Sequence, residues 1–94
     1  MHDPHIVAAD ALAMLAAERR QVAALLLDGG RSWPAYQLLA LRRTEALDAL
    51  GDLYAVTRDA GIAMRMDALI REQDSAAQVE AWAAECRAAG RVSS

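Results

Sequence analysis

A break at Gly29-Gly30 and Pro34 divides the first sixty residues into two long segments, and this division limits how the chain can fold. Paired glycines commonly end helices, whereas proline is favoured at the first position of a helix. The sequence therefore predicts helices over about 4–27 and 34–58. A short connection over 28–33 would fold them back as an antiparallel hairpin.

Helical periodicity supports both segments. In the first, Val22 and Leu26 lie on one stripe with Leu12 and Leu15, at the spacing that a 3.6-residue period requires. Asp3 and Ser32 stand where N-cap residues are expected, before Pro4 and Pro34. The buried face of the second helix is predicted to consist of Tyr36, Leu39, Ala40, Leu47, Leu50 and Tyr54.

Two shorter helices are expected in the rest of the chain. Gly61 is the next stop signal after the second helix, and a third helix is expected to follow it over about 62–73. A capping box over 75–78 begins a fourth helix, which is expected over 76–89 and to end before Gly90. Residues 91–94 are expected to form a flexible tail, and the first two residues are also expected to be flexible.

The composition favours an all-α fold. Ala, the best helix former, is the most frequent residue, Phe is absent, and there are only two prolines. Ninety-four residues fit one domain, here 1–94, because cores split only in much longer chains. We predict a small helical bundle that consists of a long antiparallel helical hairpin and two shorter helices.

The predicted helix lengths raise the question of what covers the hairpin. Helices of about 24 residues reach roughly 36 Å, whereas the third and fourth span about 18 to 21 Å each. Either these two lie end to end along the hairpin, or a second copy of the hairpin completes the bundle. The second arrangement predicts a homodimer.

Each long helix also carries a polar quartet near its middle. Four consecutive positions cover the whole circumference of a helix, and by projection Arg19 and Arg43 point toward the apolar stripes. In an antiparallel hairpin Glu18 would pair with Arg42 or Arg43. Arg19 needs an acid that its hairpin neighbours do not plainly provide, and the options are Glu45, Asp48 or another chain.

Two interpretations of these quartets are open. The arginine stems can lie along apolar surface with their heads in water, in ion pairs that contribute about 0 to 1 kcal/mol. Alternatively, they form a buried polar layer that fixes the register of the helices or the choice of partner, at some cost in stability.

Charge argues against nucleic-acid binding. The net charge is −3 and no stretch is strongly basic, so the usual attraction to phosphates is missing. Residues 56–62 loosely match the turn of a helix-turn-helix motif, with Arg65 and Arg71 following. Asp59 and Asp67 would then face phosphates unfavourably. An acidic helix-turn-helix-like regulator is the alternative function.

Nothing in the sequence indicates catalysis, a metal or a cofactor. His2, Asp3, His5 and Asp10 form the only cluster of histidines and carboxylates, and no further His is available to complete a metal site. The body of the predicted fold lacks His, the usual general base. Cys86 cannot form an intramolecular disulfide and is expected to be a small buried residue. We therefore expect a non-enzymatic protein without cofactors.

Protein binding fits more of these features. Trp33 and Tyr36 lie at the hairpin corner, where large aromatic side chains often anchor interfaces, although they could instead close the end of the bundle. No apolar run is long enough to span a membrane and no signal peptide is evident, which predicts a cytoplasmic protein. The absence of Lys and Asn indicates a GC-rich bacterial or phage gene. The expected function is a small adaptor or regulator that binds a protein partner, either another protein or a second copy, with Trp33, Tyr36 and the quartets as candidate contacts.

Overall fold

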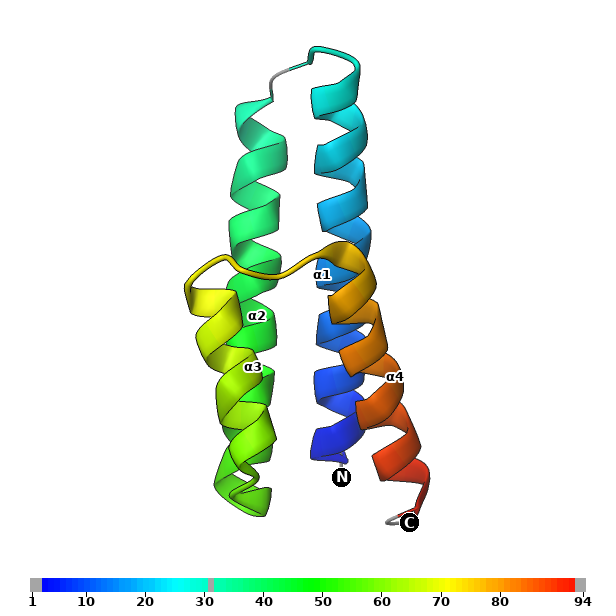
Figure 1. Ribbon diagram of the computed structural model, residues 1–94, viewed down its shortest axis with the longest axis vertical. Coiled ribbons are helices and arrows are strands. Elements are labelled where there is room, and N and C mark those ends of the chain that lie inside the picture. The colour runs from blue at the N-terminus through cyan, green and yellow to red at the C-terminus, as the bar shows by residue number, and fades with distance from the viewer. Residues whose placement is uncertain (1–2, 31, 93–94) are drawn as a thin grey trace.

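The computed structural model confirms the all-α class (Figure 1). It describes the backbone of residues 3–30 and 32–92 and the side chains of 3–30 and 32–90. No strand occurs within these ranges. The four helices are α1 (Pro4–Leu27), α2 (Trp33–Thr57), α3 (Ala60–Ile70) and α4 (Ala76–Val92).

Three of the four predicted helix starts are confirmed by the predicted caps, whereas the third helix begins at Ala60 rather than at 62. In each case a side-chain oxygen accepts a hydrogen bond from a backbone N–H that the first helical turn leaves without a partner. Asp3 accepts from His5, Ser32 from Ala35 and Ser75 from Gln78, at 2.8, 3.3 and 3.2 Å respectively.

The second helix ends within one residue of its predicted end at 58, but no glycine ends it. Helix α2 ends at Thr57, because Arg58 adopts the left-handed conformation, with φ 55°, that usually favours glycine. Asp59 then caps α3 by accepting a hydrogen bond from the N–H of Gly61 at 2.8 Å. Gly61 therefore belongs to the first turn of the next helix.

The ends of α3 and α4 also differ from the prediction. Helix α3 ends at Ile70 rather than at 73, and Glu72 takes a left-handed conformation in the following loop. Helix α4 continues through Gly90 to Val92, so residues 91 and 92 are helical and not a tail. The remaining predicted flexible positions, 1–2 and 93–94, lie outside the described residues.

Gly90 continues the helix because it permits close packing of α4 on α1. It is buried, and a Cβ at this position would come within 2.8 Å of Cδ1 of Ile6. A larger residue would require the end of the Ile6 side chain to move. This tertiary contact outweighs the local tendency of glycine to end a helix.

All four helices lie side by side in only one half of the molecule, and the other half contains only the hairpin of α1 and α2. Helix α2 returns along α1, α3 runs back along α2, and α4 runs back along α1 (Figure 1). This excludes the alternative in which the third and fourth helices lie end to end, since both cover the same half of the hairpin. The molecule measures 44 × 22 × 21 Å.

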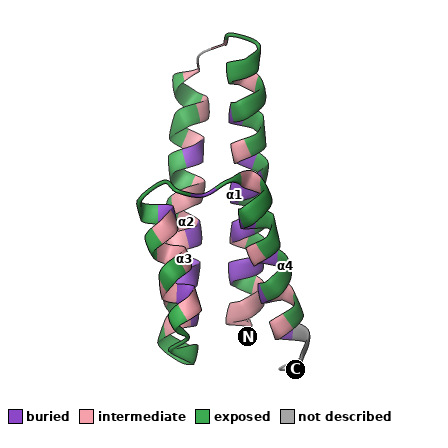
Figure 2. Ribbon diagram, in the orientation of Figure 1, coloured by how far each residue is buried: buried purple, intermediate pink, exposed green. Residues whose placement is uncertain are grey.

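The core follows from a regular spacing along the two long helices. Residues 8, 12, 15, 19, 22 and 26 of α1, and 36, 39, 43, 46, 50 and 53 of α2, alternate steps of three and four. This is the spacing of a coiled-coil seam. Most buried residues lie in the four-helix half, whereas the other half is largely exposed (Figure 2). The largest fully buried side chains are Leu12, Leu15, Leu50, Leu53, Leu69 and Val79.

The two glycines Gly51 and Gly29 should respond oppositely to substitution by alanine. Gly51 lies inside α2, and a Cβ there would meet only Cε of Met66, at an ordinary contact distance of 3.7 Å. We expect Gly51→Ala to raise the free energy of unfolding by about 0.5 to 1 kcal/mol. Urea denaturation monitored by circular dichroism measures this change.

Gly29 is the matched control because its surroundings are open but its backbone φ is +74°. Alanine is disfavoured in the left-handed region by about 1 to 2 kcal/mol, so Gly29→Ala should lower the unfolding free energy. A destabilised Gly51→Ala variant would contradict the packing described for α2 and α3.

Candidate interaction surface

A charged layer lies at the middle of the hairpin. The prediction that Arg19 and Arg43 point toward the apolar stripes is confirmed, since their side chains are 29% and 13% exposed. Both contact Asp74, whose side chain is fully buried. Arg19 Nε lies 3.3 Å from Asp74 Oδ2, and Arg43 Nη2 lies 3.5 Å from Asp74 Oδ1. We call these three residues the charged belt.

The acid for Arg19 was not among those predicted. Asp74 belongs to the loop over 71–75, which crosses the hairpin between α3 and α4 (Figure 1). Arg19 also donates a hydrogen bond to the backbone carbonyl of Asp74. A lone acid just before the Ser75 cap was the only signal in the sequence. Its pairing with Arg19 can be inferred only when the path of the loop is known.

The predicted pairing of Glu18 with Arg42 or Arg43 is wrong. Arg42 pairs instead with Glu45, at 3.1 Å, because an acid three residues further along the same helix is within reach. Arg43 reaches Glu72, at 3.8 Å, in addition to the belt. Glu18 is nearly buried, and no ion pair to it occurs among the described side chains.

The charged belt contributes little to the net free energy of unfolding, although it buries a charged group. The two carboxylate oxygens of Asp74 and Nε of Arg43 make no hydrogen bond of good geometry, although the ion pairs are close. Buried ion pairs of this kind recover their desolvation cost only with excellent hydrogen bonding. Breaking one is nevertheless strongly destabilising, because a charge is then left uncompensated.

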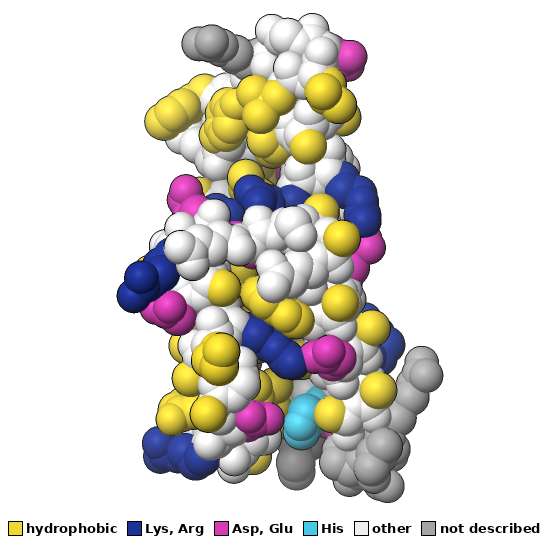
Figure 3. All heavy atoms as spheres, in the orientation of Figure 1, with side chains coloured by type: hydrophobic (Ala, Val, Ile, Leu, Met, Phe, Trp, Pro, Cys, Tyr) yellow, Lys and Arg dark blue, Asp and Glu magenta, His cyan; other side chains and the backbone are white. Residues whose placement is uncertain are grey.

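Beyond the belt the hairpin is only two helices thick. We call this part the tip; it comprises residues 20–27 of α1 and 33–42 of α2. Figure 3 shows hydrophobic side chains gathered there, separated from the rest of the face by a band of arginine and acidic groups. The exposed large hydrophobic residues of the tip are Leu26 at 52%, Leu27 at 89%, Trp33 at 72%, Tyr36 at 37% and Leu41 at 51%.

The two predicted aromatic residues lie at the start of α2, within the tip. With 72% of its surface exposed, Trp33 does not close the end of the bundle, which was the alternative to an anchoring role. Tyr36 is about one third exposed and occupies a seam position. By contrast, Trp82 packs against the core, and so does Tyr54, as predicted.

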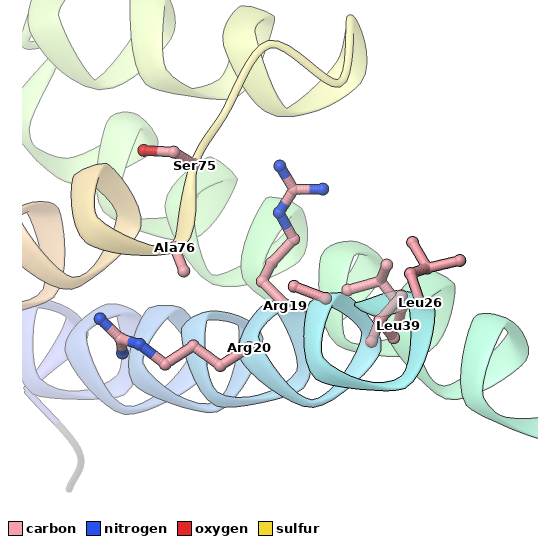
Figure 4. A pocket seen from close by; sticks show the side chains of 8 residues that line it. Arg19, Arg20, Leu26, Leu39, Ser75 and Ala76 are labelled. Atoms are coloured by element: carbon pink, nitrogen blue, oxygen red, sulfur yellow. The ribbon is translucent and has the colours of Figure 1, made fainter. Parts of the chain in front are cut away.

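A hollow of about 270 Å³ lies between the two helices at the base of the tip. Val22, Ala23 and Leu26 of α1 and Leu39 of α2 form its apolar wall (Figure 4). The start of α4 and the side chains of Arg19 and Arg20 complete the lining. We call this hollow the tip groove. It continues, toward the tip, the seam that α3 and α4 cover further down.

The structure does not favour the DNA-binding alternative. Helix α3 runs back alongside α2 (Figure 1). In a helix-turn-helix motif the second helix instead crosses the first at a steep angle. Arg65 pairs with Glu85 and lies over the ring of Trp82, while Arg71 pairs with Asp67. These arginines are therefore engaged within the protein.

No metal cluster or membrane-spanning helix is found in the part of the chain that the structure describes. No group of three His, Cys, Asp or Glu side chains is placed to hold a metal there, and His2 lies outside that part. Within the same part, no helix combines the length and apolar character that crossing a membrane demands.

Cys86 is buried, as predicted, and lies on the face of α4 that meets α1. Burial raises the pKa of its thiol, an effect that nearby Arg65 opposes and Glu85 reinforces. The protein therefore holds this residue as a neutral thiol.

Comparison with known proteins adds no guide to function, because no protein-family model, curated protein or solved structure matches the chain. The role of each residue is therefore argued from this structure alone.

Replacing Asp74 should destabilise the protein far more than replacing an exposed acid. Asp74→Asn leaves Arg19 without a counter-charge and Arg43 with only the exposed Glu72, and we expect a loss of about 3 kcal/mol of unfolding free energy. Glu80→Gln removes an acid from Arg20 in a pair about half exposed on both sides, so its cost should stay below about 1 kcal/mol. Urea denaturation compares them, and equal losses would refute a structural role for the belt.

Cys86 should react slowly with thiol reagents in the folded protein. Because its folded-state pKa is raised, its contribution to stability is complete below the unfolded-chain pKa of about 8.5 and is lost as the pH rises through the folded value. We expect labelling at pH 8 to be slow in buffer and rapid in urea, and stability to fall at alkaline pH. Equal labelling rates in both conditions would show that the α1–α4 contact opens readily.

Proposed function

We propose that this protein is a non-enzymatic helical interaction module that binds another protein through the tip. The observation that supports this most is the amount of apolar surface there. The five exposed side chains leave the equivalent of about three large residues in water, on the order of 500 Å². Patches of this size on small proteins often mark sites of interaction.

The charges of the tip favour a protein partner over other classes. Between residues 21 and 41 the sequence carries only Asp28 and Arg31 as charged residues, which cancel. Nucleic-acid binding requires a cluster of cations, and peripheral membrane helices usually have a basic rim. A neutral apolar surface instead fits the apolar centre of a protein interface.

The base of the tip provides the polar rim that such interfaces have. Arg20 pairs with Glu80, and Arg42 pairs with Glu45, at the level where the four-helix half begins. These ion pairs are partly exposed and border the apolar surface at its base without interrupting it. The candidate contacts are thus arranged as an apolar centre with charged residues on one side.

Trp33 is the residue whose removal should weaken binding most. It is 72% exposed and contributes little to the core, so Trp33→Ala should leave the helical content unchanged. We expect it to weaken the complex by about 2 kcal/mol or more, roughly thirtyfold, because exposed tryptophans often anchor interfaces. Capture of partners from host cells by the tagged protein, followed by affinity measurement, tests this expectation.

A matched control is available on α3, outside the tip. Met64 is 73% exposed, so Met64→Ala removes a similarly exposed apolar side chain and should leave binding intact. Binding that is insensitive to Trp33→Ala but lost with Met64→Ala would contradict the proposal. Retention of DNA that falls steeply with salt would instead favour a regulator.

A further inference from the structure

We propose that the partner of the tip is a second copy of this chain, docked antiparallel across a two-fold axis so that the two tips form one four-helix segment. This inference rests on the proposed function, because it names the partner of the same surface. Three features of the tip support it: the continuation of the seam, the matching lengths, and a shape that can pair with itself.

The seam of the four-helix half continues into the tip without a change of spacing. Positions 19, 22 and 26 of α1 and 36, 39 and 43 of α2 keep the alternating steps of three and four. Below the belt these stripes are covered by α3 and α4. Above it they have the same pattern but no covering helices, so two further helices would complete the same packing.

A second tip has the length needed to cover the first. Beyond the belt, α1 extends for residues 20–27 and α2 for 33–42, or about 12 to 15 Å at 1.5 Å per residue. In an antiparallel arrangement each tip would lie along the other and end against the loop over 71–75 of its partner. Helix α3 ends at this loop and α4 begins there, so neither helix covers the tip.

The tip groove also contains both parts of a self-complementary contact. Leu26 projects with half of its surface exposed, and Ala23 beside it leaves the hollow of about 270 Å³. Across a two-fold axis Leu26 of each copy would enter the hollow of the other, so every contact occurs twice. Figure 4 shows Leu26 beside Leu39 at the edge of this hollow.

Charge and area are consistent with such a dimer. Residues 21–41 carry no net charge, and Arg20 and Arg42 at the base of the tip are paired with Glu80 and Glu45, so two copies would meet with little repulsion between like charges. The exposed apolar side chains on the seam side of the tip form an interface smaller than the roughly 800 Å² per partner of a standard one, because Leu41 projects from the opposite side of α2 to the seam residue Leu39. We therefore expect a dissociation constant in the micromolar range.

Sedimentation equilibrium of the purified protein tests the proposal. At about 100 μM we expect twice the chain mass of 10.1 kDa, approaching the monomer on dilution. Leu26→Glu should give the monomer mass at all concentrations with unchanged helicity, whereas Met64→Glu, at an exposed position on α3, should remain dimeric. A wild-type protein that is monomeric throughout would overturn the inference.

Cysteine cross-linking tests the orientation. Ala23 lies near the middle of the tip, so Ala23→Cys in a Cys86→Ala background should form an interchain disulfide under mild oxidation. Ala13→Cys, at an exposed position of α1 in the four-helix half, is the control and should not. Cross-linking through Ala13→Cys alone would show a dimer built on another surface and would refute the proposed one.

The two proposals fail in different ways. If the wild-type protein is monomeric but Trp33→Ala abolishes the capture of a different protein, the second copy is excluded and the interaction function of the tip stands. If neither Leu26→Glu nor Trp33→Ala changes the mass or the capture, the tip binds no protein and both proposals are refuted.

Discussion

The carboxylate of Asp74 between Arg19 and Arg43 determines where the four-helix half of this protein ends. Two arginines at one layer of an apolar seam cannot be covered by aliphatic residues without leaving their charges uncompensated. An acid must therefore reach this layer, and the loop over 71–75 provides it. Because that loop must pass at this height, α3 stops just before it and α4 starts just after it, so the rest of the hairpin stays uncovered.

Small residues hold the other end of the bundle together. Ala8, Ala9 and Ala16 of α1 are fully buried, and Gly90 of α4 lets the helices approach closely near the chain ends. Few large side chains fill this core, which limits the stability that burial can supply. The charged belt therefore acts mainly by fixing one register of the loop on the hairpin. Apolar packing in the four-helix half provides most of the stabilisation.

The features that depend on neighbouring residues could be predicted from the sequence, and those that depend on the path of the chain could not. Caps at Ser32 and Ser75 and the apolar stripes are local signals, and they gave the hairpin and the helix starts. The end of α2 was predicted to within one residue, but the role of Arg58 in ending it was not, because Arg58 adopts a conformation that usually indicates glycine. Asp74 was missed for a different reason, since its partners lie more than thirty residues away in the chain. For the site, the exposed Trp33 could be identified, whereas the groove beside Leu39 required the structure.

The same layer that closes the bundle would also limit how any helix docks on the tip. Within the tip only Val22 and Leu39 are buried, so this part of the hairpin has almost no core of its own. Its helices persist as continuations of α1 and α2, and an added apolar surface would bury what they now expose. An incoming helix could follow the seam only as far as the loop over 71–75, where the belt and the cap of α4 block it. The depth of docking is therefore set by the interaction of Asp74 with the two arginines, which links the fold directly to the geometry of the proposed interface.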